Sequence, residues 1–392
     1  MSESTFDYLV AGAGMAGLSF VYAVCLEPTL RDKRILLVDS DTKTQNDRTW
    51  AFWEIGTGRF DSLLYRQWET VQVRHPDQSK IRVPMAPYTY KLIRGADFYA
   101  HVRSFLTDHP QVTWIQGEIT SCGADETSAW LSTSTQQFKG QILVDSIYRP
   151  RFDQPYRNHL WQHFKGYFLE MDHPIFDPNL PDIMDFSVPQ VDGECTFLYV
   201  LPFSTTRALV ELTFFSEPIL PPERYTALLR DLIAQKWPGV GYQIEEEEFG
   251  IIPMSDGSFQ EIVSKRHVRI GTAGGYTQPA TGFTFALTQE RIGELVQALV
   301  QGKFPTSTLT MPRKRMEVYA AILLQVLRDK LHEAHYFFPT LFQKNPPQRV
   351  FGFLSGHTTI WDEIRVMQSA PWVPFIRASW RVFKNRMKEK FT

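Results

Sequence analysis

The stretch 6-FDYLVAGAGMAGLSFVYAVCLEPTLRDKRILLVD-39 decides the fold that we expect for this chain. Residues 6–11 have the composition of a buried β-strand, and residues 12–17 form a glycine-rich turn. An apolar helix is expected from this turn to about Leu26, followed by a second strand over residues 34–38. The order of strand, glycine turn, helix and strand predicts a βαβ unit with the fingerprint of dinucleotide-binding domains.

The spacing of the glycines suits the binding of a pyrophosphate. Gly12 permits the tight turn, Gly14 lets the backbone approach the anion, and Gly17 lets the helix pack closely on the strand. Asp39 ends the second strand, where such domains place the carboxylate that binds a ribose. The alternative is an ordinary buried βαβ unit, but the complete series of elements favours a nucleotide. The cofactor contacts expected here are Gly12, Ala13, Gly14, Met15, Ala16, Gly17 and Asp39.

The overall composition limits the class of protein. A chain of 392 residues is expected to form two or three domains, and a net charge of −2 gives no reason to expect a nucleic-acid partner. The three cysteines are widely separated, and the ten histidines do not cluster. We therefore expect a protein of a reducing compartment with no disulfide framework and no metal site.

The two ends of the chain bear on its location. The first strand begins within a few residues of Met1, so no targeting segment is expected, and no apolar window is long enough to span a bilayer. Residues 372–383 combine bulky apolar and basic side chains and lead into Lys384, Arg386, Lys388 and Lys390. This composition suits a helix that lies on an anionic membrane surface, and a helix packed on the protein with its basic face in water is the alternative. We expect a cytoplasmic protein associated peripherally with the membrane.

Composition changes along the chain predict four segments. Residues 1–150 are expected to form the first part of a nucleotide-binding domain, with a strand pair at residues 68–74 and 81–84 and a helix over residues 95–107. Residues 151–266 are expected to form a β-rich substrate domain, with a hairpin of two apolar strands at residues 196–203 and 208–215. Residues 267–312 are expected to return to the nucleotide-binding domain, and residues 313–392 to be helical. The expected fold class is thus α/β plus α+β, with a Rossmann-type domain, a β-rich domain and a helical C-terminal region.

A second glycine loop follows the strand expected at residues 267–270. It leads through Pro279 into a helix that begins near Phe283. Strand, glycine loop and helix again direct backbone N–H groups toward a ligand, so we interpret this loop as a second wall of the same site. The expected contacts are Gly271, Ala273, Gly274, Gly275, Gly282 and Phe283.

Arg48 lies among large aromatic residues soon after the second strand of the βαβ unit. It could serve a phosphate or a flavin, or it could be a surface arginine stacked on a tryptophan, and the sequence supports both equally.

Glu211 lies in the middle of a strongly apolar strand. Strict alternation would direct this carboxylate to solvent, but the strand is apolar at the positions of both faces, which favours burial on both sides. A carboxylate buried in this way should have a raised pKa and could act as a general acid. Glu170 has a similar context with weaker support, and the acidic run at residues 245–248 is interpreted as a solvated strand start.

Taken together, these motifs resemble those of the flavin-dependent lycopene cyclases. The resemblance covers nearly the whole chain, although its specific motifs are local. Within the broader p-hydroxybenzoate hydroxylase-like FAD fold, the arginine that leads into a helix matches Arg94, whereas Asp145-Ser146 and Gly271-Thr272 match the family patterns only in part. The motifs are residues 12–17, 47–50 with 52–53, 202–203 followed by 210–213, 250–254, 271–275 and 279–283.

The resemblance implies a chemistry. The family's essential carboxylate, in its E-x-T motif, matches Glu211 with Thr213 following, which changes our interpretation of Glu211 to a catalytic acid. The implied reaction converts the acyclic ends of lycopene, or of related acyclic and monocyclic carotenoids, to β-ionone rings, giving β-carotene via γ-carotene. The implied cofactor is reduced FAD, with NAD(P)H as its reductant, and the implied source is bacterial.

Several alternatives stay open at this point. An FAD-dependent isoprenoid oxidoreductase, such as a polyene reductase or epoxidase, would use the same fold, and so would a non-catalytic carotenoid-binding scaffold. The sequence does not decide between β, γ and ε rings, between one and two ring closures, or which aromatic residues line the substrate tunnel. The oligomeric state and any part played by Glu170 are equally open.

Overall fold

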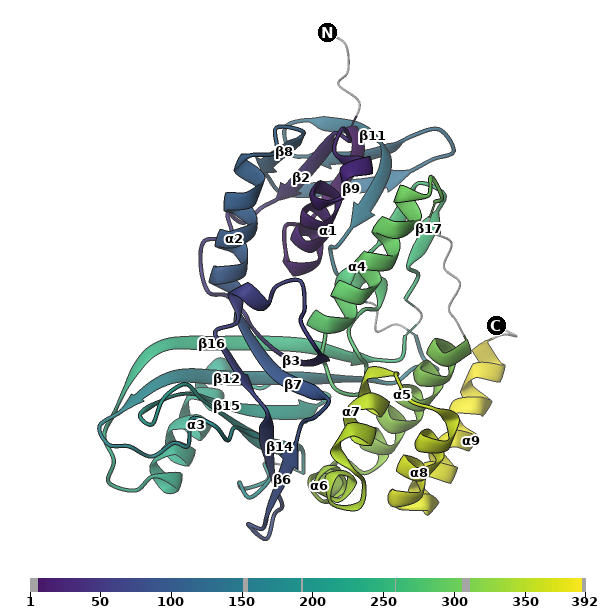
Figure 1. Ribbon diagram of the computed structural model, residues 1–392. Helices are drawn as coiled ribbons and strands as arrows, with labels where there is room; N and C mark the ends of the chain where they lie inside the picture. The colour runs from purple at the N-terminus through teal and green to yellow at the C-terminus, as the bar shows by residue number, and fades with distance from the viewer. Residues whose placement is uncertain (1–5, 151–153, 192, 258, 305–310, 390–392) are drawn as a thin grey trace.

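The computed structural model describes residues 6–150, 154–191, 193–257, 259–304 and 311–389. Their helices and strands form three layers: an eight-stranded sheet with its helices, a seven-stranded sheet, and a set of C-terminal helices (Figure 1). A third, three-stranded sheet is formed by strands within residues 49–94. The expected fold class is confirmed.

The eight-stranded sheet contains the predicted βαβ unit. Its central strands are parallel and run in the order β18-β11-β1-β2-β8, and β17 pairs at the edge. The strand β1 is almost entirely buried, as is typical of a parallel strand covered on both faces. The bounds are β1 Phe6–Ala11, β2 Ile35–Asp39, β8 Val112–Gln116, β11 Gln137–Asp145, β17 Ile262–Ser264 and β18 His267–Arg269, with β9 Ile119–Ala124 and β10 Ala129–Thr133 extending from β11.

Three helices accompany this sheet. The helix α1 is apolar on all sides and lies between the other two, so ten of its twelve residues are buried. The bounds are α1 Met15–Leu26, α2 Gly95–Thr107 and α4 Phe285–Val300. The predicted helix over residues 95–107 is confirmed at both ends.

The seven-stranded sheet has the order β16-β12-β15-β14-β13-β5-β6. The predicted hairpin of two apolar strands is present as β14 and β15. Helix α3 covers one face, where it packs on Val210 and Leu212, and the opposite face packs on the three-stranded sheet and the C-terminal helices. The bounds are β12 His159–Met171, β13 Asp182–Asp185, β14 Cys195–Pro202, β15 Arg207–Ser216, β16 Tyr242–Ser255 and α3 Pro222–Lys236.

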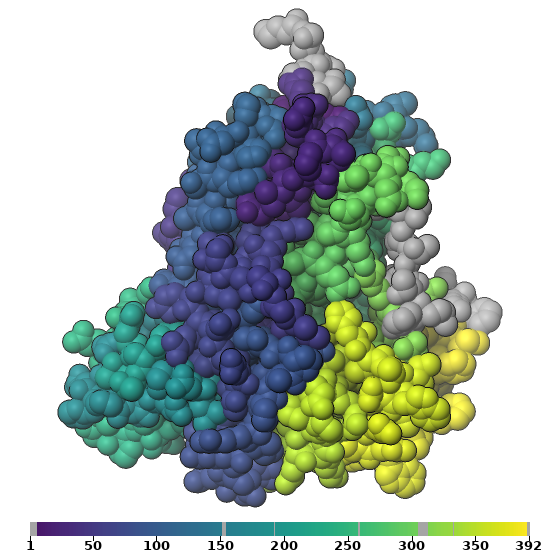
Figure 2. All heavy atoms as spheres, viewed as in Figure 1, coloured from purple at the N-terminus to yellow at the C-terminus, as the bar shows by residue number. Residues whose placement is uncertain are grey.

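The sheets do not follow the expected division of the chain at residue 150. Strands β5 (Thr70–Arg74) and β6 (Lys80–Pro84) form the predicted pair, but they extend the seven-stranded sheet because β5 pairs with β13. Arg74 and Asp182 reinforce this pairing with an ion pair of 2.7 Å. Figure 2 shows the consequence, since residues of the first hundred lie between the β-rich part and the C-terminal helices.

The three-stranded sheet consists of β3 (Thr49–Ile55), β4 (Arg66–Trp68) and β7 (Tyr88–Arg94) in the order β3-β7-β4. Its buried side chains join both large cores: Phe52 and Ile93 pack with the helices of the first sheet, whereas Trp53, Tyr90 and Leu92 pack with the second. This small sheet therefore fixes the two large ones relative to each other.

The C-terminal region is helical. Helices α5 and α9 pack together, and α6 packs on β14, β5 and β6. Among the residues that the structure describes, no helix has both the length and the apolar character needed to cross a bilayer. The bounds are α5 Met311–Asp329, α6 Ala334–Lys344, α7 Pro347–Ser355, α8 Ile360–Ser369 and α9 Trp372–Glu389.

Candidate active site

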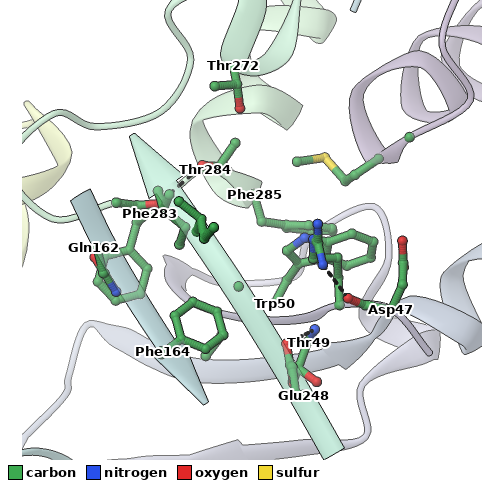
Figure 3. Close-up of a pocket in the computed structure, with 18 of the residues that line it drawn as sticks. Asp47, Thr49, Trp50, Gln162, Phe164, Glu248, Thr272, Phe283, Thr284 and Phe285 are labelled. Carbon is green, nitrogen blue, oxygen red and sulfur yellow. Dashed lines mark hydrogen bonds between the residues drawn. The ribbon is translucent and has the colours of Figure 1, made fainter. Parts of the chain in front are cut away.

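A cavity of about 420 Å³ lies where the three sheets meet. The two glycine loops border it on one side, the start of β3 on another, and the face of the seven-stranded sheet opposite α3 on a third (Figure 3). The side chains that the seven-stranded sheet and β7 contribute include Tyr90, Gln162, Phe164, Tyr199, Leu201, Leu209, Glu211, Glu248 and Ile252. One cavity thus joins the predicted nucleotide turn to the predicted catalytic strand.

The first glycine turn has the close packing that its sequence predicts. Gly12 has a φ of +96°, a conformation that glycine adopts without strain. A methyl group on Gly17 would overlap the carbonyl oxygen of Gly12, whereas the space beside Gly14 is open to 4 Å. Gly14, Met15 and Ala16 border the cavity. The open side of the turn therefore faces the space in which a pyrophosphate would lie.

Asp39 acts on this turn from outside the cavity. Its Oδ2 accepts a hydrogen bond of 2.5 Å from the backbone N–H of Ala13, and its Oδ1 accepts one of 2.8 Å from the N–H of Asp41. Asp39 is not part of the cavity lining. In this structure its carboxylate holds the glycine turn in place.

The second glycine loop approaches the first one closely. Gly271 has a φ of +61°, and a methyl group on it would lie 2.6 Å from the Cβ of Ala16. Gly271, Gly282 and Phe283 border the cavity together with Thr272, as the second-wall interpretation requires, while Ala273, Gly274 and Gly275 complete the turn outside the lining. The helix that follows begins at Phe285, two residues later than predicted.

The two predicted arginines have different surroundings. Arg48 is exposed and borders the cavity, where its Nη1 donates a hydrogen bond of 2.7 Å to the carbonyl of Asp47. Arg94 lies outside the lining, and its Nη2 donates hydrogen bonds of 2.6 and 2.8 Å to the two carboxylate oxygens of Glu246. Arg94 therefore connects the start of α2 to β16, whereas Arg48 is free to meet a ligand.

Glu211 points into the cavity, although strict alternation alone would allow it to face water. Its side chain is 8% exposed, and its Oε1 accepts a hydrogen bond of 3.0 Å from the hydroxyl of Thr213. Val210 and Leu212 pack on α3, while Leu209 packs in the core on the other side. Both faces of β15 are covered by other parts of the protein. Glu211 is therefore buried, although it points to the face opposite Val210 and Leu212.

The surroundings of Glu211 favour its protonated form. Burial raises the pKa of Glu211 well above the ordinary value of 4.5, the negative charge of Glu248 raises this pKa further, and the Thr213 hydrogen bond opposes both. Burial also raises the pKa of Tyr90, whose side chain is fully buried. The charges of Tyr199 and Glu211 raise this pKa further, because both groups lie close to Tyr90. Glu211 thus ionises less readily than a free glutamate, in a cavity lined in large part by apolar and aromatic side chains.

Glu248 is the site residue that the sequence interpretation missed. The acidic run was expected to be solvated, and this is wrong for Glu248, which is 5% exposed and borders the cavity. Its Oε1 accepts a hydrogen bond of 2.8 Å from the backbone N–H of Thr49 (Figure 3). The alternation of the strand could have indicated this position. Glu245 and Glu247 pair with Arg207 and Lys165 on one face of the sheet, whereas Glu248 points to the opposite face, into the cavity.

Glu170 does not border the cavity. It is half-buried and forms an ion pair of 3.4 Å with Arg207 at the far end of the same strands. The structure thus gives this carboxylate a surface ion pair and no place beside Glu211.

Polar atoms of the lining are ready to receive a bound molecule. The hydroxyl of Tyr90, Oε1 of Gln162 and Oε2 of Glu248 are buried and have no hydrogen-bond partner among the described residues. Buried polar atoms are rarely left unpaired in native proteins, so a polar ligand in the cavity would account for them. Together with the open space at Gly14, they fit a flavin dinucleotide that extends from the first glycine turn toward β12.

The sheets and helices have the arrangement of the p-hydroxybenzoate hydroxylase-like fold. Among solved structures, the chain is similar to halogenase PltM in complex with phloroglucinol and FAD, with a TM-score of 0.57 and 15% identity over 89% of this chain and 82% of that one. This likeness concerns the fold.

Within this fold class, residues 7–380 match the lycopene cyclase protein family, and the chain belongs to that family. It is 27% identical to a lycopene beta-cyclase of Paracoccus sp., over 94% of this chain and 95% of the relative. It is 24% identical to a lycopene beta-cyclase of Pantoea ananas, over 95% of this chain and 97% of the relative. The family resemblance expected from the motifs is confirmed.

The raised pKa of Glu211 predicts how the Glu211→Gln variant changes stability with pH. Because the folded pKa lies above the unfolded value, Glu211 contributes to stability most fully below about pH 4.5, and this contribution is lost as the pH rises through the folded pKa. Gln does not titrate, so the melting temperature of Glu211→Gln relative to the parent protein should increase between pH 5 and pH 8.

Thermal unfolding at both pH values measures this difference. Glu247→Gln, on β16 of the same sheet and half-exposed, is the matched control and should show little change with pH. A Glu211→Gln difference that is the same at both pH values would contradict the raised pKa.

Proposed function

We propose that this protein is a lycopene β-cyclase that converts the acyclic ends of lycopene to β-ionone rings, giving β-carotene via γ-carotene. The observation that carries the proposal is the position of Glu211, a buried carboxylic acid in a cavity that also borders a dinucleotide-binding turn. The names of the relatives from Paracoccus and Pantoea support the substrate and the ring type.

The reaction can be written with the residues of the cavity. The carboxyl group of Glu211 donates a proton to the terminal double bond, the neighbouring double bond attacks the resulting tertiary cation and closes the ring, and a ring carbon then loses a proton. One proton is added and one is removed for each ring, so the product is an isomer of the substrate and no electrons are gained or lost. A general acid held protonated in a dry cavity is suited to the first step.

The walls of the cavity suit the cationic intermediate. Tyr90 and Tyr199 lie near Glu211, and Phe164 borders the same space from β12. Aromatic faces attract cations and do not react with them as water would. The apolar side chains Leu201, Leu209 and Ile252 complete a surface that can accept a polyene end and exclude water.

FAD is the cofactor that fits this site. The turn at residues 12–17 would hold the pyrophosphate, and Gly271, Gly282 and Phe283, with Arg48, would border the rest of the cofactor. Gln162 and Tyr90 offer polar atoms without protein partners. In its reduced form, which NAD(P)H would regenerate, a bound flavin would supply electron density to the reaction.

The C-terminal helices offer a surface for membrane contact, which the very apolar substrate would require. Trp361, Trp372 and Trp380 are 73%, 70% and 71% exposed, and further large apolar side chains on α8 and α9 are exposed beside them. These are Ile360, Ile364, Met367, Val373, Ile376, Phe383 and Met387, interspersed with exposed Arg365, Arg377, Arg381, Lys384 and Lys388.

Packing on the protein explains only part of α9. Ala378 and Val382 are the side chains that this helix buries, whereas its tryptophans face outward. Exposed tryptophans among basic residues are typical of helices that lie in the interface of an anionic bilayer. The proposal is therefore a peripheral enzyme that receives lycopene from the lipid.

The activity is tested with lycopene in detergent or lipid under anaerobic conditions with chemically reduced flavin. The parent protein should produce cyclic ends without consuming the reduced flavin, and Glu211→Gln should retain FAD but lose turnover by about 100-fold or more, as expected for removal of a general acid. The product spectrum by chromatography is the measurement.

Two outcomes would decide against the proposal. Formation of no ring-containing product would exclude cyclase activity, and consumption of one reduced flavin for each product would indicate an isoprenoid oxidoreductase. A fully active Glu211→Gln variant would remove Glu211 from the mechanism.

The membrane surface is tested by flotation with vesicles that contain phosphatidylglycerol. The double variant Trp372→Ser/Trp380→Ser should bind these vesicles about tenfold or more weakly, because it removes two interfacial anchors. Ile55→Ser, a substitution of a 59% exposed side chain on β3, is the matched control and should bind as the parent does. Unchanged binding of the double variant would contradict the assignment of this surface.

A further inference from the structure

Three neighbouring strands place two glutamates on either side of a glycine. In the seven-stranded sheet, Gly166 of β12 is the register partner of Glu211 on β15 and also of Glu248 on β16. Residues that are directly opposite one another across a sheet point to the same face. Glu211 and Glu248 therefore project from the same face, and both border the cavity.

Gly166 leaves the space between the two carboxylates open. Adjacent strands lie about 4.8 Å apart, so the backbones of Glu211 and Glu248 are separated by about 10 Å, a gap that two glutamate side chains can close from opposite sides. A methyl group on Gly166 would lie 3.3 Å from Cβ and 3.4 Å from Cγ of Glu211. The same methyl group would lie 3.0 Å from Cδ1 of Leu209, so a side chain at this position would crowd both Leu209 and Glu211.

Only one carboxylate oxygen of Glu248 is held by a hydrogen bond among the described residues. The backbone N–H of Thr49 holds Oε1, while Oε2 is buried and has no hydrogen-bond partner among the described residues. Burial raises the pKa of Glu248 above its ordinary value. Of the charged groups just before β3, Arg48 opposes this rise and Asp47 adds to it. Lys165 of β12 points to the other face, toward Glu247 and Thr226, and leaves the pair without a cation from that strand.

We propose that Glu248 is a positioning residue that shares one proton with Glu211 and thereby keeps Glu211 protonated for the cyclisation. Two carboxylates that face each other in a buried site do not both ionise readily, and the pair titrates in two steps that belong to both groups. Tyr199 and Tyr90, which face Glu211 from β14 and β7, stay neutral because burial raises the pKa of each hydroxyl. The use of the shared proton in catalysis rests on the proposed function. The sharing of a proton by the two carboxylates does not rest on it.

The first test is the pH profile of cyclisation for Glu248→Gln. Activity requires protonated Glu211, so it should fall as the pH rises through the pKa of Glu211. With the charge of Glu248 removed, this fall should move to lower pH by about one unit or more, while the FAD content stays at the parent level. Glu247→Gln, whose side chain is half-exposed on the same strand, should leave the profile unchanged. A Glu248→Gln profile that falls at the parent's pH would overturn the proposal.

The second test does not depend on lycopene. Infrared spectra of protein labelled with ¹³C-glutamate follow the carboxyl C=O band of protonated buried glutamates during a pH titration. In the parent protein one such band should persist to higher pH than the others, and Glu248→Gln should shift the titration of this Glu211 band to lower pH, because it removes the negative charge of Glu248.

These two readouts separate the possible failures. If the parent forms no cyclic product but the infrared bands shift as described, the proton sharing stands and the cyclase assignment fails. If Glu248→Gln does not fold, the same infrared titration of Glu248→Ala decides the question, and a Glu211 band that titrates at the parent's pH there overturns the proposal.

Discussion

The burial of two carboxylates on one face of the seven-stranded sheet is the constraint on which the rest of the site depends. Glu211 and Glu248 are 8% and 5% exposed, and a charged carboxylate is costly to remove from water. Few contacts offset this cost. The hydroxyl of Thr213 donates a hydrogen bond to Glu211, and the backbone N–H of Thr49 donates one to Glu248. A retained proton removes one of the two charges. The three-stranded sheet and the C-terminal helices that cover this face therefore create the acid as well as the cavity.

Close backbone contacts connect this acid to the cofactor side of the cavity. Gly271 lies against Ala16 and joins the two glycine loops, and a side chain on Gly282 would overlap Oε1 of Gln162 on β12. The strand β12 also carries Gly166, the residue between the two glutamates. A single strand thus links the loop that borders the cofactor space to the pair that would move the proton.

The sequence predicted local elements more successfully than long-range pairings. The βαβ unit, the hairpin of β14 and β15 and the helix of residues 95–107 depend on neighbouring residues, and their patterns indicated them directly. The pairing of β5 with β13 joins residues more than a hundred positions apart, and the sequence of neither strand indicates which strand it pairs with. Residue composition therefore placed a boundary at 150 that the sheets do not follow.

The site shows the same difference. Glu211 was found because it interrupts an apolar strand, and the resemblance to the cyclases decided between its two possible orientations. Glu248 was missed because it belongs to a run of four acidic residues whose average character is that of a solvated segment. Its burial depends on the start of β3, which contacts the middle of β16 through the hydrogen bond from Thr49, and this contact is tertiary information. Arg94 led into a helix as expected, but the partner that decides its role, Glu246, lies in the same acidic run.

The most direct test of the account is the isotope content of the product formed in D₂O under anaerobic conditions with reduced flavin. The carboxyl proton of Glu211 exchanges with solvent between turnovers, whereas the proton lost comes from a ring carbon. Mass spectrometry should therefore find one deuterium for each ring closed, with the reduced flavin still reduced at the end of the reaction. A cyclic product without deuterium, or one formed with stoichiometric oxidation of the flavin, would contradict the central claim that a buried carboxylic acid performs the cyclisation.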